Sequence, residues 1–521
     1  MAILVTDPIA QDGIDVLSRY TIKLGLSREQ LIETLPNYEG LIVRSETKVT
    51  AEVIAAGRKL QVIGRAGVGV DNIDVDAATE RGIVVVNAPA GNTIAVAEHT
   101  LGLIIAAARN IPQAAAALHE GRWERAKFMG VEIRGKVLGV LGLGRIGTEV
   151  AKRAQAFEMD VIGHDPFVTE EHAARLGIRL VSFDELLEQS DFLTVHIPAT
   201  VQTDGLIAAA ELARMKPTAW IVNCARGGIV AEDALLAAID SGVIAGAALD
   251  VFQVEPAGSN PLVRHPRVVA TPHLAASTVE AQVNVAVQLA DQVIAVLDGR
   301  PAPFAVNTPS VSAESAHVLA PFARVAQTLG NLCTQLAEGQ FRNIEITYSG
   351  EIANHETSML RAAAIRGLLQ DISEENITLV NATAVARARG LPIVERMSSA
   401  PESFANLVTV RVETDRDEAS VSGTLIDGVP HIVRIDEYWV NLAPSGGYVI
   451  LTHHVDQPGV IGRVGTLLGE ADINVSSMQV GRERPRGPAL MLLSVDEAVP
   501  GQTLDKIRAI PGLTTVKVVR M

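Results

Sequence analysis

The chain is poor in cysteine, in aromatic residues and in long apolar runs. Only two of its 521 residues are cysteines, Cys224 and Cys333, and they lie far apart in the sequence. We therefore expect neither a disulfide framework nor a structural zinc site, and a reducing compartment fits. Aromatic residues make up 3% of the chain and hydrophobic residues as a whole 48%, so aliphatic side chains must form the core.

The sequence also lacks basic runs. It carries 60 acidic and 44 basic residues, for a formal net charge of −16. We therefore expect no nucleic-acid partner and no anionic membrane partner. Apolar runs such as residues 101–108 are too short to span a bilayer, and the first residues lack the basic start of a signal peptide. These features predict a cytoplasmic protein, and no cluster of residues suggests a metal site.

The length predicts three or four domains, because 521 residues exceed one compact core. In the first hundred residues, short apolar strands alternate with helical spacers, which predicts a parallel sheet covered on both faces. An alanine-rich segment, residues 93–120, is expected to form one long buried helix. Seven further buried strands lie between Val137 and His273, mostly separated by helical patterns, and predict a doubly wound α/β domain.

The pattern changes after residue 307, where strands become less regular and no glycine fingerprint recurs. Residues 443–447 have the composition of a linker. The residues after this linker follow the order strand, helix, strand, strand, helix, strand. We therefore expect an α+β domain and then a small βαββαβ domain.

A glycine fingerprint lies in "VLGVLGLGRIGTEVAKRA", residues 137–154. Gly142, Gly144 and Gly147 follow an apolar strand and open a helix, where they allow a tight turn, access for a pyrophosphate and close helix packing. Asp165 ends the next strand, where a carboxylate binds ribose hydroxyls and repels a 2′-phosphate. This pattern favours NAD as the cofactor. The alternative for Asp165 is a turn or cap role before a proline.

Three charged residues follow predicted strands further along. Arg226 can bind a carboxylate and an adjacent carbonyl oxygen with its planar fork, although a surface ion pair is the alternative. A lone histidine such as His273 is more often structural than catalytic. A contact with Glu255 would instead fix its tautomer and create a proton relay. Dehydrogenation of a secondary alcohol needs such a base, because the hydroxyl proton leaves with the hydride.

The motifs "GLGRIG", "NCARGGIV", "DVFQVEP" and "TPHLAAST" closely resemble the D-2-hydroxyacid dehydrogenases, and "HHVDQPGVIGRVGTLLGEADINV" resembles an amino-acid-sensing ACT domain. The whole chain resembles the long members of this family that act on 3-phospho-D-glycerate. The resemblance implies a Rossmann-type NAD-binding domain, residues 99–286, inserted in a flavodoxin-like α/β substrate domain, residues 1–98 and 287–306. An α+β intervening regulatory or assembly domain, residues 307–442, and an ACT domain, residues 448–521, would follow.

The resemblance also implies roles for single residues. Arg226 would bind the substrate carboxylate and C2 oxygen, and His273 would be the general base with Glu255 as its partner. Besides the glycines, the residues that would contact NAD are Arg145, Ile146, Asp165, Ile197, Cys224, Ala225 and, at the nicotinamide carboxamide, Asp250. Ile197 stands where the family usually has a hydroxyl residue, so a hydrogen bond from that side chain is lost.

Other implied contacts concern the substrate phosphate, a neighbouring subunit and an effector. The residues expected around the substrate are Arg44, Arg65, Gly67, Val68, Gly69 and, on the facing edge, Asn92. Arg125 matches a family arginine that reaches the neighbouring subunit, which implies a homo-oligomer, expected to be a tetramer. His454, Asp456 and Asn474 would bind L-serine, with a purely structural ACT fold as the alternative.

The resemblance thus implies NAD-dependent oxidation of 3-phospho-D-glycerate to 3-phosphohydroxypyruvate, the first step of L-serine biosynthesis, with feedback by L-serine. Two alternatives remain open at this point. One is a reductase for glyoxylate, hydroxypyruvate or another 2-oxo acid, and the other is an NAD(H)-sensing binding protein of the corepressor type. The paired arginines Arg44 and Arg65 favour a phosphorylated substrate.

Overall fold

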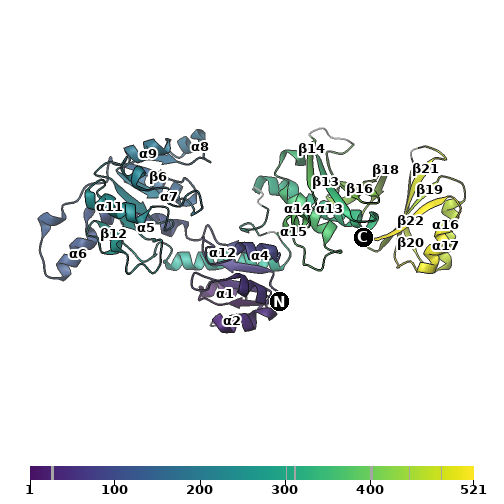
Figure 1. Ribbon diagram of the computed structural model, residues 1–521, viewed down its shortest axis with the longest axis horizontal. Helices are drawn as coiled ribbons and strands as arrows, with labels where there is room; N and C mark the ends of the chain where they lie inside the picture. The colour runs from purple at the N-terminus through teal and green to yellow at the C-terminus, as the bar shows by residue number, and fades with distance from the viewer. Residues whose placement is uncertain (25–27, 301, 310–312, 399–402, 445, 483) are drawn as a thin grey trace.

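The computed structural model describes residues 1–24, 28–300, 302–309, 313–398, 403–444, 446–482 and 484–521. Four β-sheets organise these described residues (Figure 1). Two parallel sheets lie in residues 1–309, which we call the N-terminal half. Two sheets with antiparallel pairing lie in residues 313–521, the C-terminal half. The expected α/β and α+β classes are confirmed.

The first sheet is parallel, with strand order β2-β1-β3-β4-β5. This is the 2-1-3-4-5 order of flavodoxin-like folds. Its strands are β1 (Ala2–Val5), β2 (Thr21–Leu24), β3 (Gly40–Val43), β4 (Val62–Arg65) and β5 (Val84–Asn87). The connecting helices are α1 (Gln11–Val16), α2 (Arg28–Thr34), η1 (Leu35–Asn37), α3 (Ala51–Ala56) and α4 (Val75–Glu80). Sequence reasoning missed β2, because Thr21 and Lys23 on this edge strand are exposed and the strand does not form an apolar run.

The second sheet is the expected doubly wound one, with order β12-β11-β10-β9-β6-β7-β8. Its strand order reverses beside β6, and ligands bind at such a switch point in this fold class. The strands are β6 (Val137–Leu141), β7 (Asp160–His164), β8 (Arg179–Leu180), β9 (Phe192–Val195), β10 (Trp220–Asn223), β11 (Gly246–Leu249) and β12 (Val268–Ala270). The helices are α7 (Arg145–Ala156), α8 (Glu170–Arg175), α9 (Phe183–Gln189), α10 (Ala209–Leu212), α11 (Glu232–Ser241) and η3 (Pro261–Arg264).

Two helices connect these sheets. The chain leaves the first sheet along α5 (Thr93–Arg109) and returns along α12 (Val279–Leu297). Helix α12 packs on β4, where a Cβ at Gly64 would lie 2.9 Å from Val293 Cγ2. The return of α12 to the first sheet makes the doubly wound domain an insertion, so the glycine fingerprint comes late in the chain.

The expected single helix over residues 93–120 is wrong. The chain forms α5 and then α6 (Ile111–His119), and the two helices are bent by 65°. The bend lies at Asn110, whose φ of 53° is left-handed, a conformation that asparagine tolerates better than most residues. Helix α6 is largely exposed and projects from the end of the molecule, followed by η2 (Arg125–Phe128) (Figure 1).

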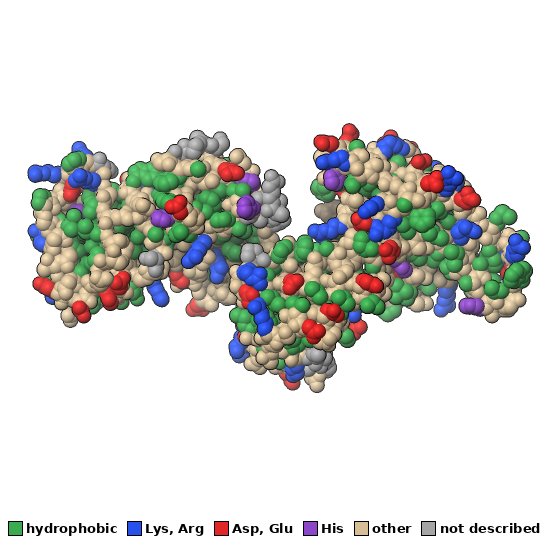
Figure 2. Space-filling view, turned by 180° about the vertical axis from the view of Figure 1, so that it is seen from behind, with side chains coloured by type: hydrophobic (Ala, Val, Ile, Leu, Met, Phe, Trp, Pro, Cys, Tyr) green, Lys and Arg blue, Asp and Glu red, His purple; other side chains and the backbone are tan. Residues whose placement is uncertain are grey.

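No single helix among the described residues has both the length and the apolar character needed to cross a bilayer. Helices α5 and α6 meet these criteria only when they are taken together, across their 65° bend. On the face drawn in Figure 2, acidic and basic side chains are interspersed.

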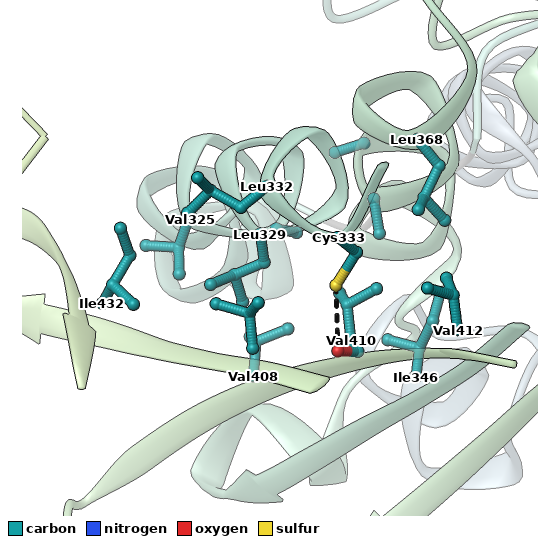
Figure 3. Close-up of a cluster of buried hydrophobic side chains, with 14 of the residues drawn as sticks. Val325, Leu329, Leu332, Cys333, Ile346, Leu368, Val408, Val410, Val412 and Ile432 are labelled. Carbon is teal, nitrogen blue, oxygen red and sulfur yellow. Dashed lines mark hydrogen bonds between the residues drawn. The ribbon is translucent and has the colours of Figure 1, made fainter. Parts of the chain in front are cut away.

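A six-stranded sheet with order β14-β13-β15-β16-β17-β18 forms the first part of the C-terminal half. Its strands are β13 (Phe341–Gly350), β14 (Ile393–Ser398), β15 (Asn406–Thr414), β16 (Glu418–Ile426), β17 (Val429–Ile435) and β18 (Tyr438–Leu442). The helices are α13 (Ala313–Leu336), η4 (Glu351–Asn354), α14 (Ser358–Leu369) and α15 (Ala382–Ala388). Figure 3 shows α13 against the sheet, with Cys333 Sγ donating to the carbonyl oxygen of Val410 at 3.3 Å. Burial raises the pKa of this thiol.

The βαββαβ order predicted for the end of the chain is confirmed. Its elements are β19 (Tyr448–Val455), α16 (Val460–Glu470), β20 (Val475–Arg482), β21 (Pro488–Val495), α17 (Gly501–Arg508) and β22 (Leu513–Arg520), with strand order β20-β21-β19-β22. Leu451, Leu490 and Val519 belong to the same buried cluster as the side chains of α13. This module therefore shares a hydrophobic core with the six-stranded domain. Residue 445 of the predicted linker lies outside the described residues.

The two halves of the molecule meet through polar contacts. Thr378 Oγ1 donates to the carbonyl oxygen of Gly82 at 3.1 Å, and Asn381 Nδ2 donates to that of Glu80 at 3.4 Å. Asn381 is only 1% exposed, so its amide is held inside this contact. The contacts between the two halves are therefore polar, whereas the two modules of the C-terminal half share an apolar core.

Candidate active site

A cleft of about 950 Å³ opens between the first sheet and the doubly wound domain. Its walls come from the loops after β3 and β4, from the start of α5 and from the ends of β10, β11 and β12. The predicted residues that line it are Arg44, Arg65, Gly67, Val68, Gly69, Asn92, Arg226, Glu255 and His273. The fold thus brings together side chains that are up to 229 positions apart (273 − 44).

His273 and Glu255 are in contact, as a proton relay requires. His273 Nδ1 lies 2.8 Å from Glu255 Oε2, and the two side chains are 49% and 37% exposed. Because the carboxylate accepts a hydrogen bond, Nδ1 carries the proton and Nε2 is left as a base. The pair can therefore take a proton from a ligand in the cleft.

Three arginines, Arg44, Arg65 and Arg226, also line the cleft. Burial lowers the pKa of Arg65, and repulsion from the nearby Arg226 and Arg44 lowers it further. The Arg226 Nε lies 3.4 Å from Asp71 Oδ2, and the arginine side chain is 30% exposed. Such a concentration of positive charge in a partly buried cleft is an anion-binding arrangement.

The loop after β4 lets these guanidinium groups lie against the backbone. A Cβ at Gly67 would lie 1.5 Å from an Arg65 nitrogen, and one at Gly69 would lie 2.1 Å from an Arg226 nitrogen. A side chain at either position would therefore displace an arginine. Asn92 lines the cleft at the start of α5. It is 8% exposed, and its buried Oδ1 has no hydrogen-bond partner in the protein.

The glycine fingerprint has the geometry that a dinucleotide needs. Gly142 has a φ of 94°, and a Cβ at Gly147 would lie 2.0 Å from Gly142 O, so the turn and the close helix packing both require glycine. A Cβ at Gly144 would meet nothing within 4 Å, which leaves the approach to the start of α7 open. No side chain caps this helix, so its first amide groups remain available to a pyrophosphate. The site fits NAD.

Asp165 has the turn role that the sequence left open. Its Oδ1 accepts from the Phe167 amide at 2.9 Å, and its Oδ2 accepts from the Leu143 amide at 2.9 Å. The carboxylate is thereby fixed beside the glycine turn, at the end of β7. Arg145 opens α7 and places its guanidinium over the Phe304 ring at 5.3 Å, so it also contacts the returning segment of the first domain.

The remaining residues expected near NAD lie around the same sheet edge. A Cβ at Gly142 would lie 2.8 Å from Ile197 Cγ2, so this isoleucine covers the glycine turn. Ile146 is half-buried behind that turn. Burial raises the pKa of Cys224 to about 12, so it is a neutral thiol, and the amide of the neighbouring Ala225 donates to Asn223 Oδ1 at 3.0 Å.

Asp250 is fully buried beneath the cleft. Burial raises its pKa, but hydrogen bonds from His99, Thr271 and the amides of Leu274 and Ala275 outweigh this effect and hold the pKa below its usual range. Its carboxylate is therefore already used within the protein. Sequence reasoning assigned Asp250 to the nicotinamide and found neither His99 nor Thr271, because a histidine inside an alanine-rich helix gives no signal.

Arg125 is not part of the cleft in this chain. It lies exposed on η2, next to α6. Trp123 and Met129 nearby are 77% and 83% exposed. The arm thus presents an arginine among large apolar side chains that are unburied in a single chain.

The three predicted effector residues do not come together within one chain. Asp456 follows β19 and forms an ion pair with Arg482 at 2.7 Å, which holds the pKa of the aspartate below its usual range. Asn474 precedes β20 and donates to Asp496 Oδ2 at 2.6 Å. Residues 475 to 482 form β20, so Asn474 lies about 26 Å along the sheet from Arg482, at roughly 3.3 Å per residue. His454 is only 3% exposed, so the expected trio is not a ready-made pocket.

No group of three or more histidine, cysteine, aspartate or glutamate side chains suited to a metal ion occurs in the part of the chain that the structure describes.

Three sequence families match the chain in succession. Residues 101–275 match the D-isomer specific 2-hydroxyacid dehydrogenase, NAD binding domain; residues 318–436 match the D-3-phosphoglycerate dehydrogenase intervening domain; residues 448–512 match the ACT domain. A solved D-lactate dehydrogenase of Aquifex aeolicus, complexed with NAD and lactic acid, covers 60% of this chain and 100% of its own at 27% identity, with a TM-score of 0.54. A glyoxylate reductase of Paecilomyes thermophila covers 59% of this chain and 98% of its own at 33% identity, with a TM-score of 0.54.

Curated relatives match almost the entire chain. A D-3-phosphoglycerate dehydrogenase of Archaeoglobus fulgidus is 47% identical over 520 residues, which cover 98% of each chain. A D-3-phosphoglycerate dehydrogenase of Methanocaldococcus jannaschii is 46% identical and covers 100% of this chain and 99% of its own. The chain therefore belongs to the D-3-phosphoglycerate dehydrogenases, a branch of the NAD-dependent D-2-hydroxyacid dehydrogenase family.

Proposed function

We propose that the chain oxidises 3-phospho-D-glycerate to 3-phosphohydroxypyruvate with NAD, the first step of L-serine biosynthesis. The observation that carries this proposal is the gathering of Arg44, Arg65 and Arg226 in the cleft that also holds the His273–Glu255 pair. A substrate with a carboxylate at one end and a phosphate at the other carries about three negative charges at neutral pH. Three arginines match that charge, whereas an unphosphorylated 2-hydroxy acid needs one.

In the proposed binding mode, Arg226 holds the substrate carboxylate and C2 oxygen. Arg44, Arg65 and the amides of the 67–69 loop hold the phosphate. Asn92, whose Oδ1 has no partner in the protein, faces the substrate from the other wall. This arrangement fixes both ends of the molecule and places C2 next to His273.

The proton leaves through His273. Its Nε2 accepts the C2 hydroxyl proton while Glu255 accepts the hydrogen bond from Nδ1 and stabilises the imidazolium that forms. When bound, NAD supplies the acceptor for the hydride that leaves C2. The glycine turn at Gly142, the amides at the start of α7 and Asp165 would hold this cofactor, and the balanced products are the 2-oxo acid, NADH and one proton.

The assay is NADH formation from NAD and 3-phospho-D-glycerate by the purified chain at mildly alkaline pH. Turnover that is lost in His273→Ala, in a variant that still binds NADH, supports the proposal. No turnover with phosphoglycerate, together with NADH oxidation by glyoxylate or another unphosphorylated 2-oxo acid, contradicts it and assigns a 2-oxo acid reductase instead.

We also propose a homo-oligomer, expected as a tetramer, with the arm of α6 and η2 as one interface. The support is the exposure of Trp123 and Met129 beside Arg125 on that arm. Burying such side chains against a second copy is favourable, and Arg125 would then reach the neighbouring cleft. Sedimentation of the intact chain tests the assembly, and a monomer at micromolar concentration contradicts it.

L-serine is the proposed feedback inhibitor, and its support is the match of residues 448–512 to the ACT family. Because Asp456 follows β19 and Asn474 precedes β20, the two residues lie at opposite ends of the sheet, and they can contact one serine only if they come from different copies. Serine binding would then depend on assembly. Asp456→Asn should raise the serine concentration that halves turnover by about tenfold, with D-serine as the ligand control. Equal inhibition of the variant and wild type would exclude Asp456 from the effector site.

A further inference from the structure

His273 lies on a turn that needs support. Its φ is 55°, a left-handed conformation that is uncommon for residues other than glycine. Its side chain is about half exposed, so packing alone holds it weakly. A group that fixes this turn also fixes the position of the imidazole relative to the substrate.

We propose that His99 is a positioning residue for His273, acting through Thr271 and Asp250. The proposal rests on the proposed role of His273 as the general base. None of the three supporting side chains needs to touch the substrate for this purpose. They would hold the segment 271–275, which carries the catalytic imidazole.

Asp250 holds the turn from both sides of His273. Its Oδ1 accepts from Thr271 Oγ1 at 2.6 Å and from the Leu274 amide at 2.7 Å, and its Oδ2 accepts from the Ala275 amide at 2.9 Å. Its backbone carbonyl accepts from the His273 amide at 2.9 Å. One fully buried residue therefore bonds with every amide from His273 to Ala275.

His99 reaches this group from a different element, helix α5. Its Nε2 lies 3.2 Å from Thr271 Oγ1 and 3.4 Å from Asp250 Oδ1. The Thr271 hydroxyl donates to Asp250, so its oxygen can only accept from His99, and the carboxylate also accepts. His99 Nε2 is therefore the donor. The turn is thus tied to the helix that begins with Asn92 on the cleft wall.

The consequence for catalysis follows from geometry. Removing the His99 donor takes away the one bond that ties Thr271 and Asp250 to helix α5, so the remaining bonds hold the left-handed turn less firmly. A displacement of about 1 Å at a reacting group can cost about 100-fold in rate. Because Arg226, Arg65 and Arg44 stand on loops other than the 271–275 turn, the affinity for the substrate should change much less than turnover.

The test compares His99→Ala, His99→Gln and a matched control, His265→Gln. His265 forms another histidine–aspartate pair in the same domain, with Asp240 at 3.2 Å, away from the cleft. The measurements are kcat, KM, the melting temperature and the isotope effect for substrate deuterated at C2. Any D-2-hydroxy acid that the wild type oxidises serves as substrate, because the turn does not depend on the phosphate. A wild type without turnover on any such acid overturns the proposed function and this inference together.

We expect His99→Ala to lower kcat about 10- to 100-fold with KM within about threefold, and to raise the isotope effect because the chemical step becomes slower. His99→Gln, whose side-chain amide can still donate, should recover most of kcat, and His265→Gln should match wild type. If His99→Ala does not fold, Thr271→Val removes the same link and should show the same pattern.

Two results overturn the inference while wild-type turnover leaves the proposed function standing. One is a kcat for His99→Ala and Thr271→Val within twofold of wild type. The other is a loss of kcat that tracks a lower melting temperature, with an unchanged isotope effect and no recovery in His99→Gln. The second result would assign His99 a purely structural role.

Discussion

The active-site cleft and the ACT sheet differ in how each brings distant residues together. In the cleft, nine predicted residues line one cavity within a single chain. In the ACT sheet, Asp456 and Asn474 sit at opposite ends of the strands, and each already has a partner in Arg482 or Asp496. One copy therefore gathers these nine residues of the cleft by itself, whereas an effector site made from Asp456 and Asn474 needs a second copy. If L-serine is the effector, the comparison predicts that its binding depends on assembly, whereas the His273–Glu255 pair and the three arginines already share one cleft in a single chain.

The largest effect that sharpens this comparison is expected at His273. His273→Ala removes the base, and positioned acid–base catalysis is worth about 10² to 10⁴ in rate. We expect kcat to fall within that range while NADH binding, measured by fluorescence, stays within about threefold. A folded variant with near-wild-type turnover would contradict the role of the His273–Glu255 pair.

The next effect concerns the arginine cluster. Arg65→Met removes a guanidinium that lies next to Gly67 and keeps much of the apolar stem. Hydrogen bonds to charged groups contribute about 1.5–3 kcal/mol, so kcat/KM for the phosphorylated substrate should fall about 10- to 150-fold. The matched control is D-glycerate, which lacks the phosphate and should respond much less. Equal losses on both substrates would place Arg65 outside the phosphate site.

The shared core of the C-terminal half gives a prediction about stability. Leu451 of the ACT sheet is 3% exposed and belongs to the cluster that includes the side chains of α13. Leu451→Ala should cost about 2–5 kcal/mol and lower one calorimetric transition that contains both modules. Leu289→Ala, in the first domain, should lower a different transition, because polar bonds join the two halves. An ACT module that melts separately would show that the common core does not couple the modules.

A smaller effect is expected in acid. Hydrogen bonds hold the pKa of the buried Asp250 below its usual range, in spite of its burial. A carboxylate of this kind contributes stability that is present above its unfolded pKa of about 3.9 and is lost as pH falls through the lower folded pKa. The melting temperature of the N-terminal half should therefore fall below about pH 4, and Asp250→Asn should show a weaker dependence on pH. If the melting temperature of Asp250→Asn falls with pH as much as that of the wild type, groups other than Asp250 cause the loss of stability in acid.

Much of the fold could be predicted because its signals are local. The glycine fingerprint, the apolar strands and the final βαββαβ order depend on spacing along the chain. The bend at Asn110 was missed although Pro112, in the first turn of α6, is a signal for a helix start, because the alanine-rich sequence on both sides of it favours one continuous helix. The edge strand β2 was missed because only a central parallel strand is apolar on both faces.

In the candidate site, too, the residues with a local sequence signal could be predicted and the long-range contacts could not. Arg226, Glu255 and His273 stand after strands, so their meeting at one sheet edge follows from topology. The support from His99 to Asp250 joins residues 151 positions apart (250 − 99) and carries no local pattern. The ion pair of Asp456 with Arg482 joins residues 26 positions apart and also carries no local pattern, so sequence alone left that carboxylate free for a ligand.

The most direct measurement is kcat/KM for 3-phospho-D-glycerate and for D-glycerate in the wild-type chain, under the same conditions with NAD. Three arginines in one cleft predict a preference for the phosphorylated substrate of at least about 100-fold, since two or more charge-assisted bonds are lost without the phosphate. Equal values for the two substrates would contradict the assignment of the cleft to a phosphorylated 2-hydroxy acid.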